Sequence, residues 1–239
     1  IIGGGISGLI AAIKAKKTAS VDVLIVDKAT PGFAGQGPLV SGAVRFLLTE
    51  AKLQEWLKWK VEIGGFLCDQ EYTYSIGKDI YPLQLEMAEW GAPLAKDEKG
   101  NLVIPFSGRY FDGLFWPSPP AMMTFFEGKA RSLGTKILKR TMVTELLMEG
   151  DRVVGAVGFS IDSGQFYILK AKATIIATGG CYYQWQELFT ASSGESVNMA
   201  YNVGAEMRNA EFANTVGVAT KEGNTWTRRT LHPYLVNAT

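Results

Sequence analysis

Glycines at the start of the chain have the spacing of a phosphate-binding turn. Gly3, Gly5 and Gly8 form a GxGxxG pattern between two isoleucines and a run of small and apolar residues. In such a turn the first glycine permits a sharp bend, the second admits a pyrophosphate to the backbone, and the third allows close helix packing. The first N–H groups of the following helix, around Ile6 and Ser7, would then point at the phosphates. The pattern therefore predicts a dinucleotide site.

An acidic residue in the right place strengthens this prediction. Residues 21–26 predict a second strand, and Asp27 follows it, nineteen residues after Gly8. A carboxylate there can accept hydrogen bonds from a ribose. NAD and FAD both use this arrangement, but residues 31–37 are rich in glycine and can present N–H groups along an extended cofactor. This loop favours FAD over an NAD-only dehydrogenase, in which another helix would follow promptly.

The elements that must position these residues form an α/β fold. Strand, helix and strand within about thirty residues predict a parallel unit with a right-handed crossover. From residue 135 to 178 the pattern changes to short strands separated by turns, which predicts a β-meander. The fold class is thus a Rossmann-like FAD-binding domain, with a parallel sheet, helices and a meander insertion. Helices are expected at 9–17, from Thr49, at about 79–90, at 119–133 and at 196–204, and strands at 136–138, 143–148, 153–161, 166–172 and 174–177.

Composition excludes several other classes of function. The chain has 239 residues, 47% of them hydrophobic, and a formal net charge of +1, so nucleic acid is not an expected partner. Its two cysteines and single histidine form no metal-ligand cluster. No apolar run reaches the roughly 20 residues of a transmembrane helix. We expect a cytoplasmic protein, or one bound peripherally at the inner face of the membrane.

Both ends of the chain look interrupted, so a fragment is expected. Ile1 and Ile2 have the character of a strand that has lost its start, and the last residues form no closing helix. Residues 1–212 are expected to form most of an FAD-binding domain, and residues 213–239 the start of a capping domain for substrate.

The chain resembles the superfamily of fumarate reductase and succinate dehydrogenase flavoproteins. Its pattern is most similar to adenylylsulfate reductase alpha subunits and to uncharacterised relatives. The resemblance covers nearly the whole chain and is specific for the FAD fold but not for the substrate. The segments that carry it are 1–8, 23–28, 35–37, 90–94, 153–180 and 193–212.

The resemblance implies roles for particular residues. Asp27 would bind the adenosine ribose, with Lys28 beside it. Catalytic residues are not identified, because the proton donor of such enzymes would lie beyond Thr239. The other implied cofactor contacts are Ala34, Gly35, Gln36 and Gly37 along the pyrophosphate and flavin ring, Val143 at the adenine, Ala177, Thr178 and Gly179 bordering the dinucleotide, and Glu195 near the ribityl chain.

Departures from the superfamily pattern narrow the range of activities that we expect. Residues 30–34 contain no histidine, so FAD should be held non-covalently, with a lower potential that favours reduction of a substrate. The His-Pro-Thr-Gly of fumarate-type enzymes is replaced by residues 213–217, and the arginine of adenylylsulfate reductases near this place is missing as well. The close forms of both enzymes are therefore not expected.

Other reactive residues have both a functional and a structural interpretation. His232 is either an acid or base, or part of a loop before Pro233. Arg228 and Arg229 either bind a carboxylate or sulfate, or are solvated. Cys181 is either a redox thiol or a small buried residue. The aromatic residues around 110–116 either wall a substrate pocket, dock an electron-transfer partner or belong to the core, and Trp56, Trp59 and Trp90 suit a core or a subunit contact.

The sequence thus predicts an FAD-dependent oxidoreductase that transfers electrons or hydride to or from a small anionic substrate. In such an enzyme the flavin supplies the redox chemistry and the protein supplies orientation and electrostatics. An iron–sulfur subunit is a candidate electron partner. The alternatives are an adenylylsulfate reductase alpha-like enzyme and a non-catalytic subunit whose FAD only relays electrons.

Overall fold

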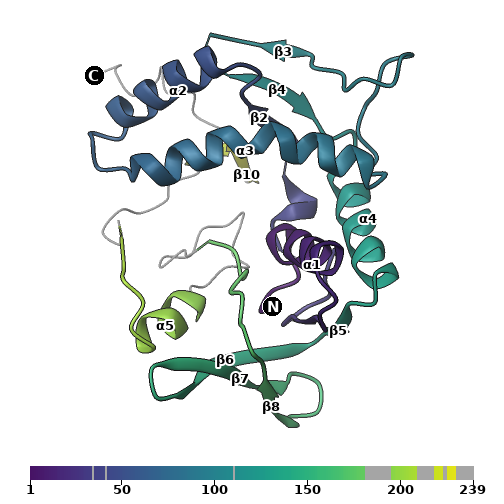
Figure 1. Cartoon of the computed structure of the whole chain (residues 1–239), viewed down its shortest axis with the longest axis vertical. Helices are drawn as coiled ribbons and strands as arrows, with labels where there is room; N and C mark the ends of the chain where they lie inside the picture. The colour runs from purple at the N-terminus through teal and green to yellow at the C-terminus, as the bar shows by residue number, and fades with distance from the viewer. Residues whose placement is uncertain are drawn as a thin grey trace. The chain divides into compact units, whose positions relative to one another are not determined.

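The computed structural model describes residues 1–33, 35–40, 42–109, 111–180, 195–208, 218–222 and 225–229 (Figure 1). It divides into two compact units, Ile1–Gly179 and Gly180–Thr239, which are taken separately below. The domain boundary predicted between residues 212 and 213 lies outside the described residues.

A parallel sheet lies at the centre of the first unit. Ile2 forms parallel bridges to Val26 on one side and to Ile176 on the other. The strand β1 (Leu24–Val26) pairs in parallel with β5 (Lys136–Leu138). The segment order 175–177, 1–2, β1, β5 confirms the predicted parallel sheet. The strand predicted at residues 21–26 is shorter than expected, because the N–H of Val21 is turned back to the carbonyl of Ala19.

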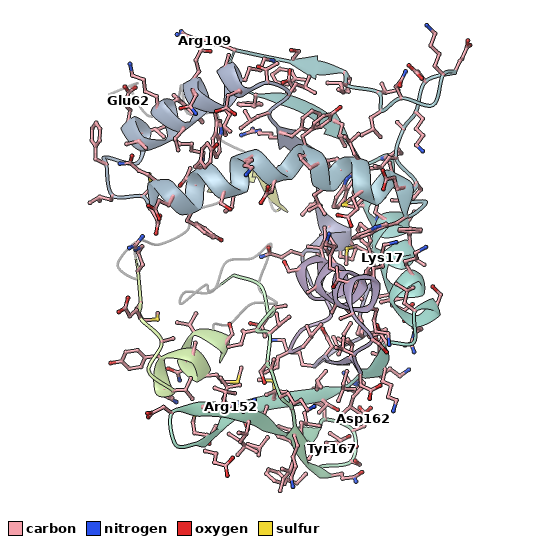
Figure 2. All side chains as sticks on the ribbon, in the orientation of Figure 1. Lys17, Glu62, Arg109, Arg152, Asp162 and Tyr167 are labelled. Atoms are coloured by element: carbon pink, nitrogen blue, oxygen red, sulfur yellow. The ribbon has the colours of Figure 1, made fainter. Side chains whose placement is uncertain are left out.

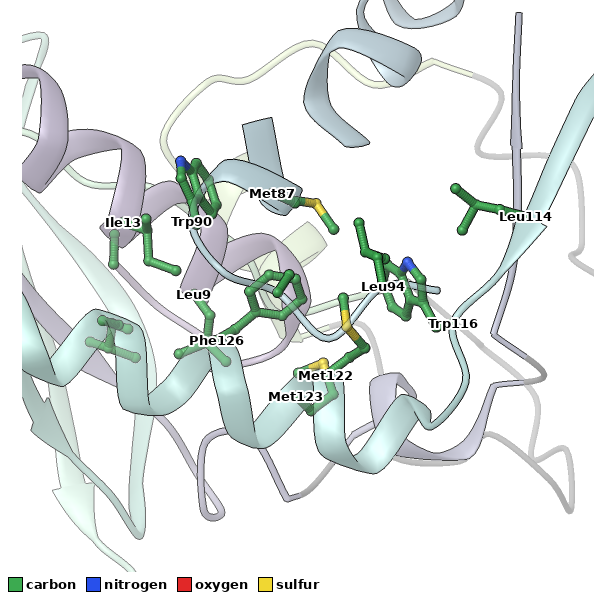
Figure 3. Packing of buried hydrophobic residues seen from close by; sticks show 14 of the residues in the cluster. Leu9, Ile13, Met87, Trp90, Leu94, Leu114, Trp116, Met122, Met123 and Phe126 are labelled. Carbon is green, nitrogen blue, oxygen red and sulfur yellow. The ribbon is translucent and has the colours of Figure 1, made fainter. Parts of the chain in front are cut away.

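Two helices packed against each other supply much of the core. The helix α1 (Ile6–Thr18) follows the glycine turn and packs against α4 (Pro119–Ser132). Two prolines occupy the first turn of α4, and the Ser118 side chain accepts the N–H of Ala121, so the predicted helix start at residue 119 is confirmed. The buried cluster shown in Figure 3 includes Leu9, Ile13, Met122, Met123 and Phe126, all fully buried.

A helical hairpin begins where Thr49 predicts it. The Thr49 side chain caps α2 (Glu50–Ile63) by accepting the N–H of Lys52. The next helix, α3 (Gln70–Glu89), begins about nine residues earlier than predicted. The expected start near residue 79 is wrong because Asp69 caps the helix, and because Gly77 is a packing residue rather than a helix break. A Cβ at Gly77 would lie 2.7 Å from Leu53 and 2.8 Å from Trp56 on α2.

Two antiparallel sheets complete the first unit. The small sheet has the order β2 (Ala43–Phe46), β4 (Asp112–Phe115), β3 (Phe106–Ser107). The predicted meander is confirmed as β6 (Thr141–Glu149), β7 (Arg152–Ser160) and β8 (Phe166–Lys170). Figure 2 shows Asp162 and Tyr167 on this meander, where Asp162 pairs with Arg140 at 2.7 Å. The loop that follows Asp27 contains a short 3-10 helix, η1 (Gly37–Leu39).

The second unit contributes one helix and one hairpin to the described residues. The helix α5 (Glu195–Asn202) matches the predicted helix within two residues at each end. The strands β9 (Val218–Glu222) and β10 (Thr225–Arg229) pair in antiparallel fashion. None of the helices in the described ranges is both long and apolar enough to cross a membrane.

Gly128 offers a test of the helical assignment of α4. It lies inside the helix, and a Cβ there would meet nothing within 4 Å. We expect Gly128→Ala to raise the free energy of unfolding by about 0.5–1 kcal/mol, because alanine loses less conformational entropy in a helix. Denaturant unfolding of both proteins measures this. An unchanged or lower stability would contradict the assignment.

Candidate cofactor site

The predicted cofactor residues converge on one edge of the parallel sheet. Gly3, Asp27 and Thr178 each follow a parallel segment, and the carboxyl ends of parallel strands meet at one edge. The N–H of Gly3 donates to the carbonyl of Val26 at 2.8 Å, and that of Ala177 to the carbonyl of Ile2 at 2.7 Å. The edge is therefore assembled from segments that lie far apart in the sequence.

The three motif glycines have three different environments. Gly3 has a φ of +102°, and a Cβ there would lie 2.4 Å from the carbonyl oxygen of Ala177. A Cβ on Gly8 would lie 1.9 Å from the oxygen of Gly3, so helix and turn touch at this point. A Cβ on Gly5 would meet nothing within 4 Å. Gly3 and Gly8 thus shape the turn, while Gly5 leaves open space in front of it.

The helix that starts at this opening can attract an anion. Gly5 is the N-cap of α1, and no side chain caps the helix at this end. The N–H groups of a first helical turn have no partner within the helix, and the helix dipole makes this end positive. The first turn of α1 also has no acidic residue. An uncapped helix end behind an open glycine is suited to a pyrophosphate.

Asp27 has a role that the sequence did not reveal. One carboxylate oxygen accepts the N–H of Gly4 at 2.5 Å, and the other accepts the N–H of Ala29 at 2.6 Å. The side chain therefore ties the glycine turn to the loop that follows β1. Each carboxylate oxygen can accept a further hydrogen bond, so the main-chain contacts are compatible with the proposed ribose contact.

Replacing Asp27 should weaken the turn before any cofactor binds. Asp27→Asn puts an amide NH2 opposite one of the two main-chain N–H donors. We expect a loss of about 1.5–3 kcal/mol in the free energy of unfolding of the apoprotein, the usual value for a hydrogen bond to a charged group. Thermal unfolding without FAD measures this. Asp22→Asn, at an exposed position just before β1, is the control and should unfold like the wild type.

The loop after Asp27 is held between the glycine turn and α4. A Cβ on Gly4 would lie 2.5 Å from Pro31, and the N–H of Gly32 donates to the carbonyl of Gly4 at 3.2 Å. Farther along, a Cβ on Gly37 would lie 2.7 Å from the sulfur of Met123 on α4. The glycines let this loop lie closely against the helix. Gly35 has a φ of +83°, and a Cβ there would meet nothing within 4 Å.

Val143, predicted to contact the adenine, lies near the start of β6. The N–H of Thr141, which begins β6, donates to the main-chain carbonyl of Asp27 at 2.9 Å, so this strand starts beside Asp27. The register of β6 against β7 shifts between Val143 and Glu145. Such bulges interrupt the ladder and are frequent next to active sites. The contact of Val143 with the adenine stays a prediction.

The structure brings together only part of the predicted set. Gly3, Gly5, Gly8, Asp27 and the start of β6 meet at the sheet edge, as described above. Gly4 and Pro31, which the sequence did not single out, belong to the same turn. Their signal was weak, because a middle position of GxGxxG and a loop proline have many other uses. Ala34, Cys181 and His232 lie outside the described residues, as do the side chains of Glu195, Arg228 and Arg229.

The aromatic residues near 110–116 fall into two groups. Trp116 is buried, and its ring packs edge-on against Phe126, so it belongs to the core. Phe111 lies near Phe106, and the Arg45 guanidinium sits 4.5 Å from its ring centroid. Trp90 is also buried, which agrees with its core interpretation. Within the described part of the chain, no group of three His, Cys, Asp or Glu residues could hold a metal ion.

The fold and this sheet edge define a dinucleotide-binding flavoprotein domain. The family model for the FAD binding domain matches residues 1–233, and the chain belongs to this family. Its relatives and structural neighbours are flavoproteins of the fumarate reductase superfamily, which confirms the resemblance seen in the sequence.

Individual matches show how far the similarity extends. The fumarate reductase flavoprotein subunit of Mycobacterium tuberculosis is 26% identical over 220 residues, covering 89% of this chain and 38% of the relative. The adenylylsulfate reductase subunit alpha of Megalodesulfovibrio gigas is 25% identical, covering 87% and 36%. A flavocytochrome c3 fumarate reductase structure, 22% identical, superposes with a TM-score of 0.72 over 90% of this chain and 42% of that one. The chain therefore spans well under half the length of these proteins.

Proposed function

We propose that this chain binds FAD non-covalently and forms the cofactor half of an oxidoreductase acting on a small anionic substrate. The observation that carries the proposal is the open glycine turn. Gly5 leaves space in front of the uncapped end of α1, and Asp27 stands beside it at the same sheet edge. A pyrophosphate and its ribose fit these groups by charge and by hydrogen bonding.

Bound FAD would supply two-electron redox chemistry, and the residues of this chain would bind and orient it. The first turn of α1 would hold the pyrophosphate, and Asp27 the adenosine ribose. The loop along α4 would accompany the rest of the cofactor, and Val143 would face the adenine. The names of the relatives support substrates such as fumarate and adenylylsulfate, both of which are anions.

Non-covalent attachment is proposed from the loop itself. Residues 30–34 contain no histidine, the residue that attaches FAD covalently in succinate dehydrogenases and in many fumarate reductases. Without such a bond the cofactor depends on the main-chain and ribose contacts above. Two of the relatives are named as subunits, which supports an electron-transfer partner; we propose an iron–sulfur protein in that role.

The visible spectrum of the purified protein tests this function. We expect a yellow protein that releases all of its flavin on acid precipitation. The full-length protein, once reduced, should be reoxidised by fumarate, adenylylsulfate or another small anionic acceptor. Flavin remaining with the precipitate would contradict non-covalent binding, and reoxidation by protein partners alone would favour the relay subunit. A colourless protein that does not bind added FAD would overturn the proposal as a whole.

A further inference from the structure

One exposed leucine lies on the loop that leads away from the glycine turn. Leu39 ends η1, and its side chain is 67% exposed. The next residue, Val40, is also exposed. The position of this loop, rather than the exposure of Leu39 alone, indicates what covers the Leu39 side chain.

The loop follows α4 in a definite direction. Near the glycine turn, a Cβ on Gly32 would contact Glu127 and the carbonyl of Met123. Farther along, Gly42 lies against Trp116 and Pro119, at the beginning of the helix. The stretch of α4 from Glu127 back to Pro119 spans about 12 Å at a rise of about 1.5 Å per residue. The loop therefore carries the chain about that far from the phosphate end of the site.

The two sides of the loop differ in character. One side faces α4, where a Cβ on Gly37 would meet Met123. The other side is open, since a Cβ on Gly35 would meet nothing within 4 Å and Leu39 is exposed. In FAD the ribityl chain separates the flavin ring from the pyrophosphate, by a distance comparable to the length of α4 that this loop follows. The adenosine end is assigned to Asp27 and β6, so the ring end must extend the other way.

We propose that the side chain of Leu39 packs against the isoalloxazine ring and shields it from water. The proposal rests on the function proposed above and adds a contact for the flavin end of the cofactor. An apolar side chain suits the ring because its faces and its dimethylbenzene edge are apolar. Leu39 would position the ring and take no part in electron transfer itself.

The test compares two leucine variants of the FAD-loaded protein. Leu39→Ala should weaken FAD binding about tenfold, from the apolar area no longer buried. It should also blur the fine structure of the long-wavelength flavin band and make the flavin more accessible to iodide quenching. Leu67→Ala is the matched control, since Leu67 is 59% exposed but lies in the α2–α3 turn. Leu39→Met should restore wild-type behaviour.

The outcomes separate this inference from the function on which it rests. A wild-type protein without FAD affinity would overturn both. A wild type that binds FAD, with Leu39→Ala and Leu67→Ala giving the same affinity, spectrum and quenching, would overturn the Leu39 contact alone. A change in unfolding temperature with an unchanged flavin spectrum would likewise assign Leu39 to a contact with another part of the protein.

Discussion

Replacing Gly5 with valine should abolish FAD binding and leave the apoprotein folded. The φ of Gly5 is −73°, which any residue can adopt, and a Cβ there would meet no protein atom within 4 Å. The new side chain would instead occupy the space proposed for the pyrophosphate. We expect the dissociation constant for FAD to rise by about 100-fold or more, which corresponds to roughly 3 kcal/mol.

The apoprotein should lose little stability in this variant. Valine is a poorer N-cap than glycine, which costs at most about 1 kcal/mol. FAD titration and thermal unfolding of the apoprotein measure the two effects separately. Wild-type affinity in Gly5→Val would show that no phosphate lies at this turn.

Gly8→Ala provides the contrasting variant. Its Cβ would lie 1.9 Å from the carbonyl oxygen of Gly3, a main-chain atom that cannot move without distorting the turn. We expect the free energy of unfolding of the apoprotein to fall by at least about 1–3 kcal/mol, as at other overpacked sites. The two variants thus distinguish a glycine that leaves space for a ligand from a glycine that leaves space for the protein backbone. If both variants changed FAD affinity and apoprotein stability equally, the proposed difference between Gly5 and Gly8 would be contradicted.

Local patterns in the sequence were sufficient to predict the core of the site. The strand, the glycine turn and α1 follow one another along the chain, so their spacing alone predicts a dinucleotide turn. Thr49 and the Pro119–Pro120 pair marked helix starts for the same reason, because capping is decided by neighbouring residues. The meander also followed from short apolar segments separated by turns.

Features that depend on contacts between distant segments were missed. The start of α3 was placed too late, because only the packing of Gly77 against Leu53 shows that this glycine lies inside a helix. The bond from the N–H of Gly4 to the Asp27 carboxylate was missed for a similar reason, since Gly4 is distant in the sequence. A carboxylate after a strand indicates a ribose contact, but nothing in its spacing indicates that it also holds the turn.

A buried ion pair is another long-range feature, and it joins α2 to the small sheet. Asp112 on β4 is fully buried and pairs with Lys52 on α2. It also accepts the hydroxyl of Ser107 at 2.6 Å and the N–H of Leu48 at 3.3 Å. The pair thus fixes α2 against the small sheet. No local pattern could have predicted this pair, because sixty residues separate Lys52 from Asp112.

Removing this carboxylate should cause the largest loss of stability. Asp112→Ala leaves the Lys52 ammonium partly buried without its partner. We expect a decrease of about 3–5 kcal/mol in the free energy of unfolding, the usual cost of breaking a buried pair from one side. Denaturant unfolding measures it. Asp162→Asn, which breaks the exposed pair with Arg140, is the control and should leave the unfolding midpoint nearly unchanged.

The same pair predicts a pH dependence of stability. Burial raises the pKa of the Asp112 carboxyl, but the hydrogen bonds from Lys52, Ser107 and Leu48 and the lysine charge lower it further, so it lies below the ordinary value. A carboxyl with a lowered pKa in the folded state contributes its full stability above its unfolded pKa, about 4. That contribution is lost as the pH falls through the folded pKa. The stability difference between wild type and Asp112→Asn should therefore be constant near neutrality and shrink below about pH 4. A difference that grew on acidification would show that the buried carboxyl is protonated in the folded protein.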